Sequence, residues 1–297
     1  MIAVPRAPTL SVMVNFHNMT REAPRTLHSL TPAYQQGAVP DAYDVLAIDN
    51  GSMPPLDATL SARTGERFTH LRFEPHWPSP CAAINAGVAA SAAEFVMVCI
   101  DGARILSPGI VRYALAALQL APHPFVYTLG MHLGPKIQNE SLIEGYDRAR
   151  EDALLDTVDW RRDGYSLFDI SSVALSSRAG YFSALTESNC FAMRRGDYLA
   201  LGGLDEAFTS AGGGLANLDF FNRVHEDPRF QPVMLLGEAT FHQFHGGTAT
   251  NVPPAAHPWR SMAKEYEASR GRVFKSSFRP PLYFGAVGEQ ARRLLVY

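Results

Sequence analysis

The segment EFVMVCIDGARILSPG, residues 94 to 109, constrains the fold of this chain more than any other. Its apolar run from Phe95 to Ile100 ends abruptly at Asp101, and a turn then leads to Pro108. This pattern predicts a buried strand with one carboxylate at its carboxyl end. In an open α/β sheet, ligands bind at that end of the strands. Asp101 is therefore a candidate ligand-binding residue, although a strand-end Asp can also simply hold the turn that follows it.

The same alternation continues through the first half of the chain. Apolar, β-rich runs alternate with helical patterns, which predicts a mostly parallel, doubly wound sheet with flanking helices. The predicted strands are 10–16, 43–48, 68–73, the run that ends at Asp101, and 125–129, and the predicted helices include 82–93 and 110–120.

The second half begins with an irregular segment, residues 130 to 186, and such a long irregular stretch is usually functional or mobile. Regular patterns then return, with predicted strands at 188–193, 232–236 and 239–244 and predicted helices at 196–201, 215–224 and 259–270. No linker separates domains. We expect one α/β domain over 1–252 and a helical, basic C-terminal extension over 253–297 that packs on it.

Composition excludes several classes of function. The net charge is −3 without a basic run, so neither a nucleic-acid groove nor a strong attraction to an anionic membrane is indicated. The cysteines, Cys81, Cys99 and Cys190, are odd in number and lack metal-type spacing. The N-terminus lacks a signal-peptide pattern, and no apolar run approaches a membrane span. We expect a cytoplasmic protein with reduced thiols.

Taken in order, these motifs resemble the family-2 glycosyltransferases of the GT-A fold, over roughly residues 9 to 247. The matching pieces are SVMVNFHNMTREAPRTLHSL, YDVLAIDNGS, INAGVAASAAEFV, the Asp101 strand, SNCFAMRRGDYLALGGLDEAF, GGGLANLDFFNR and FHQFHGG. The resemblance implies transfer of a sugar from a nucleotide-diphosphate sugar to an acceptor hydroxyl, assisted by Mn²⁺ or Mg²⁺. It also implies a place in polysaccharide biosynthesis, with a glycan or lipid-linked acceptor.

The resemblance implies a donor site at the strand ends. Asn15 and His17, in the first polar turn, would bind the nucleotide. Asp49 would accept hydrogen bonds from the nucleobase, or it would only form the turn that follows. Asn85 would face the ribose or phosphate, or it would only pack its helix on the sheet. Asp101 would bind the metal and so contact the nucleotide.

The metal site departs from the family pattern. Where the family has Asp-x-Asp, this chain reads Asp101-Gly102-Ala103, so the second carboxylate is missing. His242 and His245 are the further candidate ligands, because imidazole suits Mn²⁺. On a regular strand their spacing puts them on opposite faces, so only one is expected to reach the metal. The remaining ligands would be diphosphate oxygens and waters.

The position of the general base also differs from the family pattern. The family places an acidic pair at the start of the late helix, where this chain has Ala216 and Asn217. An amide cannot accept the acceptor's proton near neutral pH. Asp219 lies about 200° around the helix from Asn217, which makes it a structural or acceptor-binding residue. Glu187 and the turn at 205–206 are the candidate substitutes, and retaining chemistry without a conventional base stays open.

Two further regions are candidates for ligand contact. Gly213 and Gly214 precede a helix, where free N–H groups would bind a sugar or phosphate, although a simple hinge fits equally well. The irregular segment and the tail would meet the acceptor, where Tyr146, Trp160 and Tyr165 would either stack on sugars or pack the loop. The basic tail would give at most peripheral membrane contact.

Other classes of protein remain for comparison. The missing carboxylates favour a catalytically degenerate module that only binds a nucleotide or glycan. A nucleotidyltransferase or a dinucleotide-binding dehydrogenase would need a glycine-rich first turn, and residues 15 to 18 contain no glycine.

Overall fold

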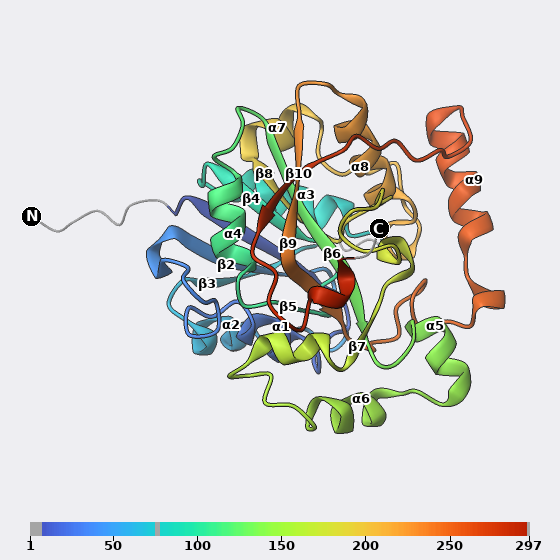
Figure 1. Ribbon diagram of the computed structural model, residues 1–297. Helices are drawn as coiled ribbons and strands as arrows, with labels where there is room; N and C mark the ends of the chain where they lie inside the picture. The colour runs from blue at the N-terminus through green and yellow to red at the C-terminus, as the bar shows by residue number, and fades with distance from the viewer. Residues whose placement is uncertain (1–7, 75–77, 296–297) are drawn as a thin grey trace, which may run out of the picture.

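The computed structural model describes residues 8–74 and 78–295 and is built around one mixed sheet (Figure 1). The strands in these ranges are β1 (Leu10–Phe16), β2 (Tyr43–Asp49), β3 (Phe68–Arg72), β4 (Phe95–Cys99), β5 (Arg104–Leu106), β6 (Pro124–Leu133), β7 (Ser171–Val173), β8 (Cys190–Arg194), β9 (Gln231–His242) and β10 (Leu282–Gly285). Their order is β10-β9-β6-β8-β4-β1-β2-β3, with β5 paired to β9 and β7 to β6.

Helices cover both faces of this sheet. They are α1 (Ala23–His28), α2 (Ala58–Thr64), α3 (Cys81–Ala90), α4 (Ile110–Ala117), α5 (Gln138–Ser141), α6 (Arg148–Leu155), α7 (Arg195–Ala200), α8 (Ala216–Glu226) and α9 (Trp259–Arg270). Because successive side chains of a strand point to opposite faces, β1 feeds two separate cores. Val12 and Val14 pack in one with residues of α1 and α4, and Met13 packs in the other with residues of α3 and α8.

The strand directions bring distant parts of the chain to one edge of the sheet. β1 runs parallel to β2 and β4, as the sequence predicted. β8 runs antiparallel to both β4 and β6, and β9 runs parallel to β6. The direction reverses from β4 to β8 and again from β8 to β6, so β6 and β9 run in the same direction as β1 and β4. The carboxyl end of β9 therefore lies at the same edge as the carboxyl ends of β1 and β4. That edge is where the sequence predicted ligands to bind.

The second half of the chain is more regular than its sequence indicates. The two closing strands predicted at 232–236 and 239–244 are one strand, β9, whose pairing with β6 contains an irregularity. Gly237 in β9 has a φ of 77°, a conformation that other residues rarely adopt. The segment 130–186, which was expected to be irregular, contains α5, α6 and β7. Its path is set by packing against the sheet rather than by its own periodicity.

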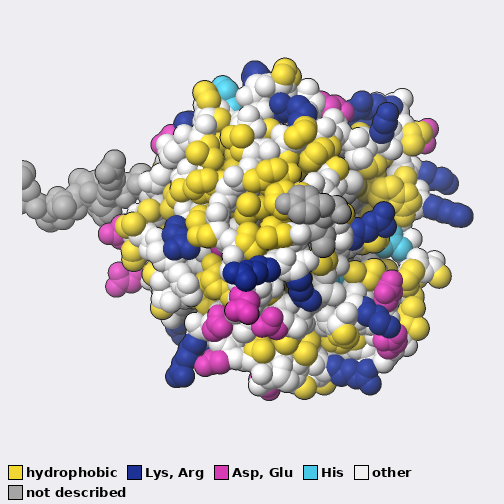
Figure 2. Space-filling model, in the orientation of Figure 1, with side chains coloured by type: hydrophobic (Ala, Val, Ile, Leu, Met, Phe, Trp, Pro, Cys, Tyr) yellow, Lys and Arg dark blue, Asp and Glu magenta, His cyan; other side chains and the backbone are white. Residues whose placement is uncertain are grey.

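The C-terminal extension is more closely joined to the domain than an added helix would be. After α9, β10 pairs in parallel with β9 and becomes the edge strand of the sheet. Figure 2 shows hydrophobic side chains gathered on the face over which β10 runs in Figure 1. Leu282 and Tyr283 of β10 are about two-fifths exposed, at 45% and 40%. Within the described ranges, no helix is both long enough and apolar enough to cross a bilayer.

Candidate active site

A cleft of about 2090 Å³ opens at the edge where these strand ends meet. Ordinary small-molecule pockets have volumes of roughly 300–1,000 Å³, so this cleft has room for two ligands side by side. One wall comes from the strand ends of the first half of the chain. The other comes from segments within the ranges 174–189, 211–218, 245–250 and 254–262.

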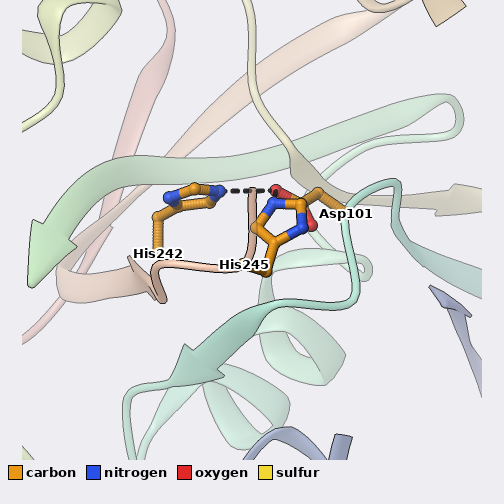
Figure 3. A group of neighbouring side chains, drawn as sticks. All are labelled: Asp101, His242 and His245. Carbon is orange, nitrogen blue, oxygen red and sulfur yellow. Dashed lines mark ion pairs between the residues drawn. The ribbon is translucent and has the colours of Figure 1, made fainter. Parts of the chain in front are cut away.

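Asp101, His242 and His245 form a compact cluster in this cleft (Figure 3). Their ligand atoms all lie within 4.8 Å of one another. Nε2 of His242 is 2.9 Å from Oδ2 of Asp101, and Nε2 of His245 is 3.7 Å from the same oxygen. One oxygen and two imidazole nitrogens are a donor set that suits Mn²⁺ and similar divalent ions. The cluster therefore fits the metal that the resemblance implies.

The expectation that only one histidine would reach the site is wrong, because the strand is not regular to its end. β9 stops at His242, and the chain then turns back and brings His245 to the same side. The turn is held by Asn251, whose Oδ1 accepts hydrogen bonds from the backbone N–H groups of residues 245 to 247. Side chains three residues apart point to opposite faces only while the chain remains a strand.

A second hydrogen-bond network fixes which nitrogen of His242 faces Asp101. Gln138 donates through Nε2 to the backbone carbonyl of His242, and its Oε1 accepts from Asn251 Nδ2. Oε1 of Gln138 lies 2.7 Å from Nδ1 of His242, so Nδ1 must carry the hydrogen. In the neutral ring the lone pair of Nε2 then points at a carboxylate oxygen. The Thr250 hydroxyl, 3.4 Å from Nε2, is only a distant donor. A proton or a metal ion belongs between these two acceptors.

The charges of the cluster suit a metal. Burial lowers the pKa of His242 to about 4, against the pull of Asp101, and so favours the neutral form of this ring. Burial alone would raise the pKa of Asp101. Its neighbours His245, His242 and Arg104 outweigh that effect and hold the pKa well below the ordinary value. An ionised carboxylate and a neutral imidazole are the forms that bind metal ions.

Of the residues expected to bind the nucleotide, Asn15 and His17 do line the cleft. Asn15, at the end of β1, is buried, and its Nδ2 donates to the backbone carbonyl of Ile100. Its Oδ1 is buried without a hydrogen-bond partner among the described residues, so it can accept from a ligand. Nδ1 of His17 is 2.8 Å from the Asn50 carbonyl oxygen. The first polar turn is thus part of the site.

Asp49 is placed differently. It is fully buried, and its oxygens accept from the N–H groups of Ser52 and Leu56 and from the Arg72 guanidinium. These bonds outweigh the effect of burial and lower the pKa of Asp49. Asp49 does not line the cleft in the described part of the chain. It holds the turn after β2, which is the structural alternative that its sequence allowed.

Asn85 also serves a turn. Its Nδ2 donates to the Leu204 carbonyl and to Glu206, and its Oδ1 accepts from Tyr198 and from the Leu204 N–H. It lines a second depression together with residues of the segment 201–206, Arg223 and Arg270, and this depression shares no lining residue with the main cleft. In the structure Asn85 holds the turn at Leu204, a role that differs from the packing of its helix on the sheet that the sequence allowed.

The three candidate catalytic residues separate into two groups. Glu187 and Asn217 both line the cleft, and Nδ2 of Asn217 donates to Oε2 of Glu187 over 2.6 Å. Asp219 is a buried residue of α8, and its oxygens bind the guanidinium groups of Arg223 on the same helix and of Arg270 on α9. Within the described part of the chain Asp219 does not line the cleft, and its ion pairs favour the structural role over acceptor binding.

The glycine loop reaches the cleft through only some of its residues. Gly212 and Gly214 line the cleft, whereas Gly213 is buried against Pro80. All three have positive φ values, of 74°, 86° and 54° in chain order. Gly214 therefore remains a candidate sugar or phosphate contact, and Gly213 shapes the loop behind it.

The aromatic residues of the segment 130–186 mainly pack the loop. Tyr146 and Trp160 are buried, and the Tyr165 hydroxyl bonds to Glu238 in the core. Trp259, at the start of α9, does line the cleft and is 45% exposed. Trp259, Gln138 and Asn251 all lie outside the motifs, so no pattern in the sequence predicted that they belong to the site.

Comparison with known proteins supports the fold. No family model and no curated protein sequence matches the chain. Among solved structures, glucosyl-3-phosphoglycerate synthase from Mycobacterium tuberculosis in complex with Mn²⁺, UDP and glucosyl-3-phosphoglycerate matches with a TM-score of 0.51 and 17% identity, over 90% of this chain and 82% of that one.

Two other solved structures match less well. S. aureus TarS 1-349 in complex with UDP gives a TM-score of 0.49 at 13% identity, over 78% of this chain and only 59% of that chain. Mannosyltransferase PcManGT from Pyrobaculum calidifontis, in complex with GDP-Man and Mn²⁺, gives 0.46 at 17% identity, over 91% of this chain and 66% of that one.

The chain has the GT-A glycosyltransferase fold that its sequence predicted, with a mostly parallel sheet and flanking helices. Low identity means that these matches establish the fold alone.

Proposed function

We propose that this protein is a glycosyltransferase that moves a sugar from a nucleotide-diphosphate sugar to a hydroxyl of a glycan or lipid-linked acceptor, with the help of Mn²⁺ or Mg²⁺. The observation that carries the proposal is the cluster of Asp101, His242 and His245 at the strand ends of a GT-A fold. A lone pair of His242 aimed at a carboxylate needs a cation, and the cleft around it accommodates a second substrate.

The donor would lie along the first-half wall of the cleft. Asp101, His242 and His245 would hold the divalent ion, whose chemistry there would be to neutralise the charge of the leaving diphosphate. Asn15 offers a buried acceptor to the nucleotide, and His17 lies in the same turn. The use of Mn²⁺ in the complexes of the mycobacterial synthase and PcManGT is in keeping with this assignment.

Glu187 is the residue that we assign as general base. It is a half-buried carboxylate of the cleft outside the metal cluster, with the Asn217 amide bound to one of its oxygens. In this role the other oxygen would take the proton of the acceptor hydroxyl as that oxygen attacks the sugar carbon. Asn217 would keep the carboxylate pointed at the acceptor, so an amide at the family's base position becomes a positioning residue.

The test of the proposal is a thermal-unfolding screen of the full chain against UDP, GDP, dTDP and CMP, each with Mn²⁺ and with a chelator. A ligand present at 100 times its dissociation constant adds about 2.7 kcal/mol to the free energy of unfolding. With an unfolding entropy of about 2 cal/mol/K per residue, that corresponds to a shift of about 4 °C for a chain of 297 residues. A metal-dependent shift with one nucleotide supports the proposal, and the absence of any shift contradicts it.

A degenerate binding module is the second candidate, and a specific observation favours it. Ala103 and Asn217 stand where the family has carboxylates, and Asp49 and Asn85 are occupied with turns. The two candidates differ in turnover. Slow hydrolysis of the bound nucleotide-sugar by the native chain, abolished in Glu187→Gln, identifies an enzyme, whereas tight binding with no hydrolysis or transfer identifies the module.

A further inference from the structure

Arg104 is a buried cation beside the cluster that the proposed metal chemistry does not use. It lies on β5, directly opposite His242 on β9, which in turn pairs with His132 on β6. These side chains therefore form a row across three neighbouring strands, just below the loop that carries Asp101. Arg104 is only 4% exposed, yet it lines the cleft.

The guanidinium of Arg104 has few partners for a buried cation. Its Nη1 is 3.4 Å from the Thr240 hydroxyl, and its Nε is 3.8 Å from Oδ2 of Asp101. Nε makes no hydrogen bond within the described part of the chain. Buried guanidinium groups are normally paired and fully hydrogen-bonded, because leaving their donors unsatisfied is costly. A buried donor left without a partner, beside a cleft, points to a ligand that completes the hydrogen bonds of this guanidinium.

The Arg104 guanidinium borders the cleft beside a glycine. Gly130, on β6 and separated from β5 by β9, also lines the cleft, and a Cβ placed on it would lie 3.6 Å from Nη1 of Arg104. Because glycine has no side chain, nothing from this position covers Nη1. The planar fork of an arginine matches two oxygens of a phosphate group, which a metal ion or a lysine does not do in the same way.

We propose that Arg104 is a resident diphosphate-binding residue of the donor site, which takes over part of the charge neutralisation that the family assigns to the metal. The inference rests on the proposed function, since the diphosphate belongs to the nucleotide-sugar. Two features of the chain point the same way. The second metal-binding carboxylate is replaced by Ala103, and the next residue carries a positive charge.

This assignment predicts an unusual order of binding. Without an anion, Arg104 repels a divalent ion and competes with it for Asp101. A diphosphate removes that repulsion by binding both cations. The native chain should therefore bind a diphosphate measurably without metal, and should bind Mn²⁺ weakly until a diphosphate is present.

The experiment measures two affinities in the full-length native chain and in Arg104→Gln. Titration calorimetry with inorganic pyrophosphate and with UDP and GDP, in the presence of a chelator, gives metal-free anion binding. Electron paramagnetic resonance with Mn²⁺ alone gives metal binding. Arg104→Gln is expected to weaken metal-free pyrophosphate binding at least tenfold and to tighten binding of Mn²⁺ alone severalfold. Opposite changes cannot come from general loss of structure.

Two control variants define the effect further. Arg260→Gln removes the same charge from an exposed position on the cleft wall and is expected to change both affinities less than twofold. Arg104→Lys keeps the charge without the planar fork, so it should keep Mn²⁺ binding weak while losing part of the anion binding. It also provides a folded variant if the glutamine substitution unfolds the chain.

The outcomes separate this inference from the proposed function. If nucleotide binds with Mn²⁺ but Arg104→Gln and Arg104→Lys leave both affinities unchanged, Arg104 does not contact the diphosphate and the inference is overturned. If the native chain binds no diphosphate with or without metal, the proposed function fails and the inference fails with it.

Discussion

The two ends of the cleft are built in different ways. At the donor end, Asp101 and His242 come from the ends of buried strands, and His242 is fully enclosed by a hydrogen-bond network. At the acceptor end, Glu187 precedes its strand, the glycine loop has three consecutive positive φ values, and Trp259 stands exposed on α9. The first end is a fixed arrangement of charges, and the second is a wall of loops and one helix.

This contrast indicates that the two ends of the cleft have different roles. A pre-set charge arrangement is what diphosphate and metal binding require, because it need not be reorganised when the ligand arrives. A loop-built wall is what variable acceptors require, because loops change without disturbing the sheet. Substitutions at the donor end should therefore affect binding of nucleotide and metal, and substitutions at the acceptor end should affect turnover and acceptor use.

The largest effect is expected from Asp101→Ala, which removes the one carboxylate of the cluster. We predict that metal-dependent nucleotide binding falls at least 100-fold, or by about 2.7 kcal/mol of binding free energy, as measured by calorimetry with Mn²⁺. Asp101→Asn keeps the shape and should show nearly the same loss. Thermal unfolding without ligand serves as the control for folding. Unchanged affinity in both variants would remove the metal role from Asp101.

The next largest effect concerns turnover alone. Glu187→Gln is predicted to lower kcat by roughly 10²–10⁴-fold, the usual contribution of a general base, with donor affinity unchanged. Asn217→Ala should lower kcat less, because it only loosens the carboxylate that it holds. Steady-state kinetics on both variants makes the comparison. A larger loss at Asn217 would show that the amide acts directly on the sugar or acceptor.

A smaller effect is expected at Trp259. An exposed indole at the cleft wall can stack on a sugar ring, a contact worth about 1 kcal/mol. Trp259→Ala should therefore raise the KM for a glycan acceptor about fivefold and leave nucleotide binding unchanged. Trp259→Phe, which keeps an aromatic ring, should restore most of the affinity. If nucleotide binding weakens as well, α9 belongs to the donor end, and the division described above does not hold.

The last prediction concerns stability rather than binding or turnover, and it contrasts two buried carboxylates. Unlike Asp101, Glu238 on β9 has its pKa raised by burial, to about 7, despite hydrogen bonds from Ser107, Tyr165 and Gly109. The folded chain therefore keeps a proton that the unfolded chain loses above its ordinary pKa of about 4.5. The native protein should lose stability from this group as pH rises from 5 to 8.

Glu238→Gln removes the titration and can keep the hydrogen bonds, because its amide oxygen accepts from Ser107 and Gly109 while its nitrogen faces Tyr165. Its Tm relative to the native chain should therefore rise between pH 5 and pH 8, with nucleotide binding at pH 7 unchanged. An equal difference in Tm at both pH values would show that Glu238 is ionised in the folded protein throughout.

The sequence predicted the donor end better than the acceptor end for a physical reason. Apolar runs locate buried strands, and parallel strands share an edge, so Asp101 could be placed at the ligand-binding edge without coordinates. The late histidines were expected there only through the resemblance to the family, and only one of them was expected to reach the metal. Prediction from the sequence fails where the backbone leaves regular secondary structure. The return of His245 depends on Asn251, and the contact between Glu187 and Asn217 depends on how a loop packs against α8.

Other residues show a second limit. The pattern around Asp49 is the same whether the carboxylate binds a base or holds its own turn, and only the partners Ser52, Leu56 and Arg72 distinguish the two. The same holds for Asn85 and the turn at Leu204. Strand-end position predicts where a side chain lies, whereas its hydrogen-bond partners decide what it does.

The place of β9 in the sheet has a consequence for how the protein is made. This strand lies between β6 and β10 and also pairs with β5, so the partners of one late segment extend from residue 104 to residue 285. Pairings of such long sequence separation form slowly, because a long loop must close before any contact rewards it. Asp101 leaves the ribosome well before His242, and no growing chain that lacks β9 has the cluster. Nucleotide binding should thus appear only with the completed sheet, and the ligand then stabilises that state alone.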